Sequence, residues 1–174
     1  MVIGNIESKT ATLLTQFEIH KPAVPVKQIA KQLGLRIQLA HLDEATSGML
    51  VRRRGHQPLI VINRGNSKQR RTFTIAHEIG HFLLHPSKSL WVDRVEIAAR
   101  NEVSARGDDR REIEANNFAA ALLMPRTMLE AMFPFGPYDA WQIGYGLLVN
   151  AARVFGVSQP AMTFRLINTG IMKQ

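Results

Sequence analysis

Two histidines spaced one helical turn apart, in a segment with helical apolar periodicity, constrain this fold more than any other feature of the sequence. The segment begins at Ser67, a residue suited to capping a helix, and runs to Leu84, shortly before Pro86. His77 and His81 are four residues apart, so on a helix their imidazoles project from the same face. The apolar residues around them are Ile75, Ala76, Ile79, Phe82, Leu83 and Leu84. They predict that the helix is buried in the fold.

The run His77-Glu78-Ile79-Gly80-His81 fits the H-E-x-x-H pattern of zinc-binding helices. Two neutral imidazoles on one helical face can reach the same ion, and Zn²⁺ accepts both imidazole and carboxylate ligands. Glu78 lies about 100° around the helix from His77, beside such an ion. From there its carboxylate can accept a proton from a metal-bound water and later pass it to a leaving amine. The pattern therefore predicts a Zn²⁺ site with Glu78 as the catalytic general base.

A catalytic zinc site needs a third protein ligand. His85 is excluded by geometry, because eight residues along a helix from His77 correspond to a rise of about 12 Å. The acidic side chains of the next predicted helix remain, and they are Asp108, Asp109, Glu112 and Glu114. Spacing alone does not choose among these four.

The remaining sequence indicates an α+β fold. Helices are expected at residues 8–20, 25–34, 67–84, 108–123, 140–155 and 160–167. Strands are expected at residues 35–40, 47–53 and 58–63, with a hairpin turn at Gly55 between the last two. We predict a small β-sheet packed on helices over residues 1–135, followed by a helical C-terminal extension over residues 136–174. Within this extension, residues 147–166 resemble a helix-turn-helix. Lys27–Gly34 resembles the first helix of such a motif, but a β-rich stretch follows it, and we assign it to core packing.

Two motifs resemble those of the ImmA/IrrE family of zinc metallopeptidases. The first is Arg71-Thr72-Phe73-Thr74-Ile75-Ala76-His77-Glu78-Ile79-Gly80-His81-Phe82-Leu83-Leu84-His85. The second is Glu112-Ile113-Glu114-Ala115-Asn116-Asn117-Phe118-Ala119-Ala120-Ala121-Leu122-Leu123-Met124-Pro125, which is similar to the family's E-x-x-A-N-x-F-A-x-x-L-L-M-P helix. The resemblance is strong over about residues 25–130 and looser in the tail.

The resemblance implies a zincin-like domain with a gluzincin-like site. In such a site Zn²⁺ is held by His77, His81 and the first glutamate of the second motif, Glu112. Asn116, one turn further along, would orient a ligand. Glu114 is the reserve candidate for the third ligand.

The same resemblance implies a substrate class. Family members act on a helix-turn-helix repressor or antitoxin, typically encoded nearby in mobile elements or stress-response loci, and so relieve transcriptional repression. We therefore expect a zinc-dependent endopeptidase. The alternative is a non-catalytic regulatory protein that binds DNA or sequesters a repressor, with a structural or vestigial metal site.

The amino-acid composition indicates which partners and which cellular compartment to expect. The 22 Lys and Arg against 14 Asp and Glu give a formal net charge of +8, which favours anionic partners such as nucleic acid or an acidic protein surface. The absence of cysteine excludes disulfides and thiolate ligands, and it fits the cytoplasm that we expect. No apolar run reaches about 18 residues, so no membrane span is expected. An extended substrate is expected along a sheet edge near Ser47–Arg53.

Overall fold

The computed structural model describes residues 2–86, 90–94 and 108–173. The chain divides into two compact units, one made of residues 25–119 and the other of residues 1–24 together with 120–174. Each unit is described by itself. No described helix is long and apolar enough to cross a membrane.

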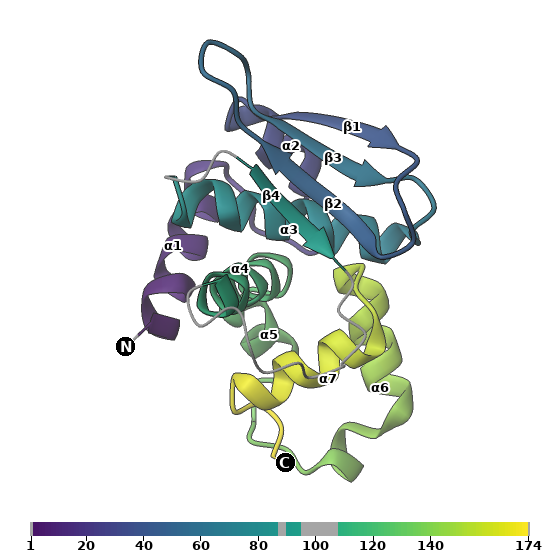
Figure 1. Cartoon of the computed structure of the whole chain (residues 1–174). Helices are drawn as coiled ribbons and strands as arrows, with labels where there is room; N and C mark the ends of the chain where they lie inside the picture. The colour runs from purple at the N-terminus through teal and green to yellow at the C-terminus, as the bar shows by residue number, and fades with distance from the viewer. Residues whose placement is uncertain (1, 87–89, 95–107, 174) are drawn as a thin grey trace. The chain divides into compact units, whose positions relative to one another are not determined.

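A four-stranded sheet forms one side of the unit that spans residues 25–119 (Figure 1). Its strands are β1 (Arg36–Ala40), β2 (Thr46–Val51), β3 (Leu59–Asn63) and β4 (Leu90–Arg94). They lie in the order β1-β3-β2-β4, with β1 parallel to β3 and β2 antiparallel to both of its neighbours. Leu50, Ile60 and Ile62 are fully buried, as the alternation of side chains along a strand requires. Met49 and Val51 of β2 and Leu59 and Val61 of β3 are half-buried.

Helices α2 (Val26–Gln32) and α3 (Lys68–Leu84) pack on this sheet (Figure 1). Two glycines let α3 approach its neighbours closely. A Cβ atom at Gly48 of β2 would lie 2.6 Å from Cγ2 of Thr74 in α3. A Cβ atom at Gly80 would lie 3.2 Å from the side chain of Phe118 in α4 (Asp108–Leu123). The middle of α4 is thereby brought against the C-terminal half of α3.

The other unit is helical in the part of it that the structure describes. It contains α1 (Val2–Gln16), α5 (Arg126–Met132), α6 (Ala140–Phe155) and α7 (Gln159–Asn168), besides the end of α4. Helix α6 is interrupted at Gly144, which has φ 62° and ψ 160°, and it ends at Gly156 in the left-handed conformation. The large apolar side chains Leu129, Phe155, Met162 and Leu166 form its buried core.

The α+β fold with a small sheet packed on helices and a helical C-terminal part is confirmed. The helix expected at residues 8–20 instead spans Val2–Gln16, and the chain turns away after it at Glu18, which has a φ of 55°. Strand β4 and helix α5 were not among the elements expected from the sequence. The substrate edge expected near Ser47–Arg53 is wrong, because β2 pairs with β3 on one side and with β4 on the other. The division at residue 135 stays a prediction.

Candidate metal centre

Helix α3 places the two motif histidines in the interior. Ser67 caps the helix by accepting a hydrogen bond from the backbone N–H of Arg70, at 3.2 Å. Every residue from Thr74 to His81 is buried, with His77 exposed by 2% and His81 by 1%. The apolar faces of α3 are buried by the sheet and by α4, so the two imidazoles are held on a helix with little freedom to move.

The two imidazoles converge with one carboxylate from α4. The Nε2 atoms of His77 and His81 lie 2.9 Å apart. The carboxylate of Glu112 lies with Oε2 3.2 Å from Nε2 of His77 and Oε1 3.3 Å from Nε2 of His81. Among the described residues, these three form the group of His, Asp and Glu side chains that could hold a metal ion.

Asn116 orients the first of these ligands. Its Oδ1 lies 3.0 Å from Nδ1 of His77, so the ring donates its Nδ1–H to the amide oxygen. The lone pair of the imidazole is then on Nε2, which faces His81 and Glu112. A hydrogen bond of this kind commonly fixes the tautomer and orientation of a metal-binding histidine.

The protonation states of Glu112 and His81 favour the binding of a cation. Burial raises the pKa of Glu112, but the imidazoles of His77 and His81 beside the carboxylate outweigh this and lower the pKa to about 2. Burial lowers the pKa of His81, more than the neighbouring carboxylate raises it. At neutral pH Glu112 is therefore ionised and His81 neutral, and these are the states in which both residues bind metals.

The other sequence candidates lie elsewhere. Glu114 accepts a hydrogen bond from Nε of Arg110 at 3.1 Å, and its Oε2 lies 3.9 Å from Nε2 of His85. The Nε2 atom of His85 also lies 3.2 Å from the backbone carbonyl of Arg111, so His85 links α3 to α4. The side chains of Asp108 and Asp109 lie outside the described residues.

Glu78 is fully buried next to His77 on α3. A carboxylate in this position is shielded from bulk water. Its burial is consistent with a role beside the three converging side chains, and its position one residue after His77 is the one that the motif requires.

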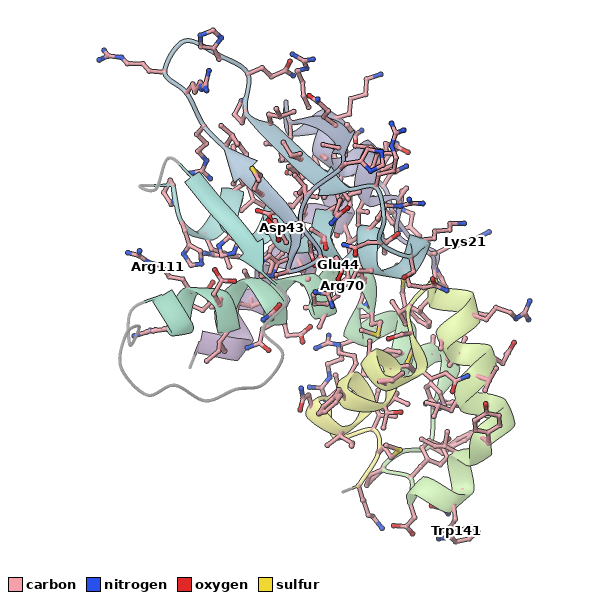
Figure 2. The ribbon with its side chains drawn as sticks, turned by 45° about the vertical axis from the view of Figure 1, so that its right-hand side comes forward. Lys21, Asp43, Glu44, Arg70, Arg111 and Trp141 are labelled. Carbon is pink, nitrogen blue, oxygen red and sulfur yellow. The ribbon has the colours of Figure 1, made fainter. Side chains whose placement is uncertain are left out.

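Two arginines, Arg70 and Arg52, hold the two ends of α3 in place. At the start of the helix, the Nε and Nη2 atoms of Arg70 donate to Oγ of the buried Ser47 at 3.0 and 2.7 Å (Figure 2). At its end, the guanidinium of Arg52 donates to three backbone carbonyls, those of His81, Phe82 and His85, at 3.2, 2.7 and 3.0 Å.

Arg52 thus satisfies the carbonyls of Phe82 and His85, which the end of the helix leaves without intrahelical partners, and it shares the carbonyl of His81 with the backbone N–H of His85. Its charge complements the negative end of the helix dipole. The same guanidinium lies 4.9 Å from the centre of the Phe82 ring. Because one of the carbonyls belongs to His81, Arg52 fixes the turn that carries a candidate ligand. Sequence alone offered no signal for this contact, since Arg52 begins a run of three arginines that is typical of a solvated surface.

A known protein family matches most of this chain. The profile of the family described as Peptidase_M78, IrrE N-terminal-like domain, matches residues 30–166. The chain belongs to this family. The matched range of the IrrE N-terminal-like domain contains α3 and α4. It therefore includes the three converging side chains and Asn116. The resemblance to the ImmA/IrrE family is confirmed.

Two individual proteins show more limited similarity to this IrrE-like chain. "Uncharacterized immunity region protein 2" of Bacillus phage phi105 is 39% identical over 66 residues, which cover 38% of this chain and 37% of that protein. A solved structure described as a Mycobacterium tuberculosis transcriptional regulator matches with a TM-score of 0.62 and 17% identity, over 94% of this chain and 46% of that one. The second similarity shows the fold alone. The chain spans less than half the length of both relatives.

Proposed function

We propose that this chain is a zinc-dependent endopeptidase, and that His77, His81 and Glu112 are its zinc ligands. The observation that carries the proposal is the convergence of two imidazole nitrogens and one ionised carboxylate, with Asn116 directing the Nε2 atom of His77 toward the other two. Membership in a family of peptidases supports the same conclusion.

The donor set and its dimensions fit zinc. Ligand atoms at about 2.0–2.2 Å from one ion lie no more than about 4.4 Å apart. The measured separations of 2.9, 3.2 and 3.3 Å fall inside this limit. Two neutral imidazoles and one carboxylate also form a ligand set that zinc peptidases use. Zn²⁺ bound there would lower the pKa of a water molecule toward about 7 and polarise a carbonyl oxygen.

Glu78 is the proposed catalytic residue. Its carboxylate would accept a proton from the attacking water and then deliver that proton to the nitrogen of the leaving amine. Enclosure in the core keeps bulk water from competing for the carboxylate, since Glu78 is fully buried. Asn116 would act on His77 and not on the substrate.

The proposed substrate is a helix-turn-helix repressor or antitoxin in the cytoplasm, and its cleavage would relieve transcriptional repression. One relative supports a setting of this kind, since it is named for a phage immunity region. Glu114 has other partners, which favours Glu112 as the third ligand.

The proposal is tested by incubating the purified chain with the helix-turn-helix protein encoded beside its gene. We expect a discrete fragment of that protein in the presence of zinc, none after treatment with a chelator, and its return when zinc is restored. A partner that stays intact in all three samples, with zinc content verified, would contradict the peptidase proposal. Cleavage that persists after verified metal removal would contradict the role of zinc.

A further inference from the structure

A groove of about 600 Å³ lies in the unit that spans residues 25–119, away from the metal ligands. It is bounded by α2, by β1 and by the first half of α3. Its lining residues are Lys27, Lys31, Leu35, Arg36, Ile37, Leu39, Gln57, Arg71 and Ile75. The lining contains four cations, four aliphatic side chains, one amide and no carboxylate.

The cations of the groove are available to a ligand. Lys27 and Lys31 are exposed and lie one turn apart on α2, and Arg36 is exposed at the start of β1. None of the three forms an ion pair with a carboxylate in the described part of the chain. The guanidinium of Arg71 donates to the carbonyl of Arg64, a neutral partner, at 3.1 Å, and it forms no ion pair with a carboxylate among the residues that the structure describes. Such a rim attracts carboxylates or phosphates.

The floor of the groove is apolar and incompletely covered. Leu35 and Ile75 are buried and Ile37 is half-buried, while Leu39 is 41% exposed. Leu35, Ile37 and Leu39 alternate along the chain and so project from the same side of β1, toward α2 and α3. The helices thus leave the outer part of this strip open to solvent.

Strand β1 is also an edge of the sheet. It pairs with β3 on one side, and no other described strand pairs with it. An edge strand presents unpaired backbone N–H and C=O groups, to which an extended chain can add as a further strand.

We propose that this groove is a docking site for an extended segment of a partner protein, in which aliphatic side chains alternate with carboxylates. The aliphatic side chains would cover the strip formed by Ile37 and Leu39, and the carboxylates would lie on the side of Arg36, which alternates with Ile37 along β1. Lys27, Lys31 and Arg71 would attract the acidic segment to the groove. Nucleic acid fits less well. No aromatic side chain lines the groove to stack on a base, and the apolar floor offers nothing to a phosphate backbone.

Docking here is separate from the proposed catalysis. Ile75 precedes His77 by two residues, which places the two side chains about 200° apart around α3. The groove and the metal ligands therefore lie on different faces of the helix. Binding at the groove would survive loss of the metal, so its failure and failure of the peptidase proposal are distinguishable.

The test uses a fluorescently labelled peptide of about eight alternating leucines and glutamates, with its ends acetylated and amidated. Binding to the whole chain is followed by anisotropy. One control peptide carries glutamine in place of glutamate, another serine in place of leucine, and a short DNA duplex is the third probe. We expect the parent peptide to bind at least about tenfold more tightly than either control peptide.

Matched protein variants locate the binding. Lys31→Glu combined with Arg36→Glu is expected to weaken binding of the peptide at least about tenfold. The control combines Arg53→Glu with Arg54→Glu on the exposed β2–β3 turn, which changes the net charge by the same amount. It is expected to weaken binding of the peptide about twofold or less. Three results would each overturn the proposal. The two double variants could lose the same affinity for the peptide, the wild-type chain could fail to bind the peptide, or DNA could bind at the groove more tightly than the peptide does.

Discussion

The Nδ1 atom of His77 lies 3.0 Å from the Oδ1 atom of Asn116, and this contact directs the other ring nitrogen toward His81 and Glu112. Replacing Asn116 with alanine should lower the affinity for zinc about 10- to 100-fold, because the imidazole loses the acceptor that fixes its tautomer. Asn116→Asp keeps an acceptor and should bind zinc more tightly than the alanine variant. Competition with a chromophoric chelator measures these affinities.

Asn117→Ala is the matched control, since Asn117 is the next residue on α4 and lies about 100° around that helix from Asn116; it should leave zinc affinity within about twofold of wild type. If Asn116→Ala and Asn117→Ala had equal affinities, Asn116 would not orient the ligand.

The ligand set predicts which residues control metal content. His77→Ala and Glu112→Gln should each lose the roughly one zinc per chain that the wild-type protein is expected to carry. Glu114→Gln and His85→Ala should keep it, because these residues contact each other and Arg110 or the backbone of Arg111. Elemental analysis of the folded variants gives the answer. Full zinc content in the Glu112 variant would exclude Glu112 as the third ligand.

The sequence was sufficient to predict α3 and the convergence of its two imidazoles, because helical periodicity and a four-residue spacing are local properties. It could not choose between Glu112 and Glu114 by spacing. That choice depends on how α4 is rotated against α3, which is set by the close approach of Gly80 to Ala115 and Phe118. Only the resemblance to a family pointed to Glu112.

The features that the sequence did not predict, strand β4 and the contacts of Arg52, also depend on long-range contacts. β4 is five residues long and ends in Asp93 and Arg94, so no apolar alternation marks it, and it forms by pairing with β2. Arg52 contacts carbonyls about 30 residues away along the chain. Its neighbours Arg53 and Arg54 are exposed, as the sequence suggested for the whole run.

Arg52 provides a test of how far the end of α3 supports the metal site. Arg52→Lys removes the planar fork that reaches three carbonyls and should lower the free energy of unfolding by about 1–2 kcal/mol. It should also weaken zinc binding by about tenfold, because the turn that contains His81 becomes looser.

Arg53→Lys is the control for Arg52→Lys, since Arg53 is exposed; it should change neither quantity measurably. Both quantities are measured on the same preparations, the first by urea denaturation and the second by chelator competition. A loss of stability with unchanged zinc affinity would restrict Arg52 to a role in folding.

In the helical unit, Arg165 is the buried charge that matters most for stability. It is 6% exposed, its Nη1 lies 2.6 Å from Oε1 of Glu7, and its Nε donates to the carbonyl of Met124 at 3.0 Å. Glu7→Gln leaves the guanidinium without its counter-charge and should cost about 2–3 kcal/mol of unfolding free energy. Glu130→Gln breaks the exposed pair with Arg126 and should cost less than about 1 kcal/mol. Urea denaturation measures both variants. If they lost similar amounts of unfolding free energy, the buried pair of Arg165 with Glu7 would not contribute more to stability than an exposed pair.

Glu78→Gln separates the proposed peptidase from a regulator that acts by binding alone. Glu78 is not a proposed zinc ligand, so the variant should keep the metal and any complex with the repressor while losing the group that accepts a proton from water. General-base catalysis contributes about 10²–10⁴-fold, so cleavage of the repressor should fall below detection in an ordinary assay. In cells under inducing conditions, the variant should leave the repressor at full length and its promoter silent, whereas the wild type should shorten the repressor and activate the promoter. Zinc content and thermal melting of the purified variant serve as controls, since glutamine replaces glutamate with almost no change in volume. If the wild type and the variant both induced the promoter while the repressor stayed intact, binding would be sufficient for function and the buried carboxylate of Glu78 would have no catalytic role.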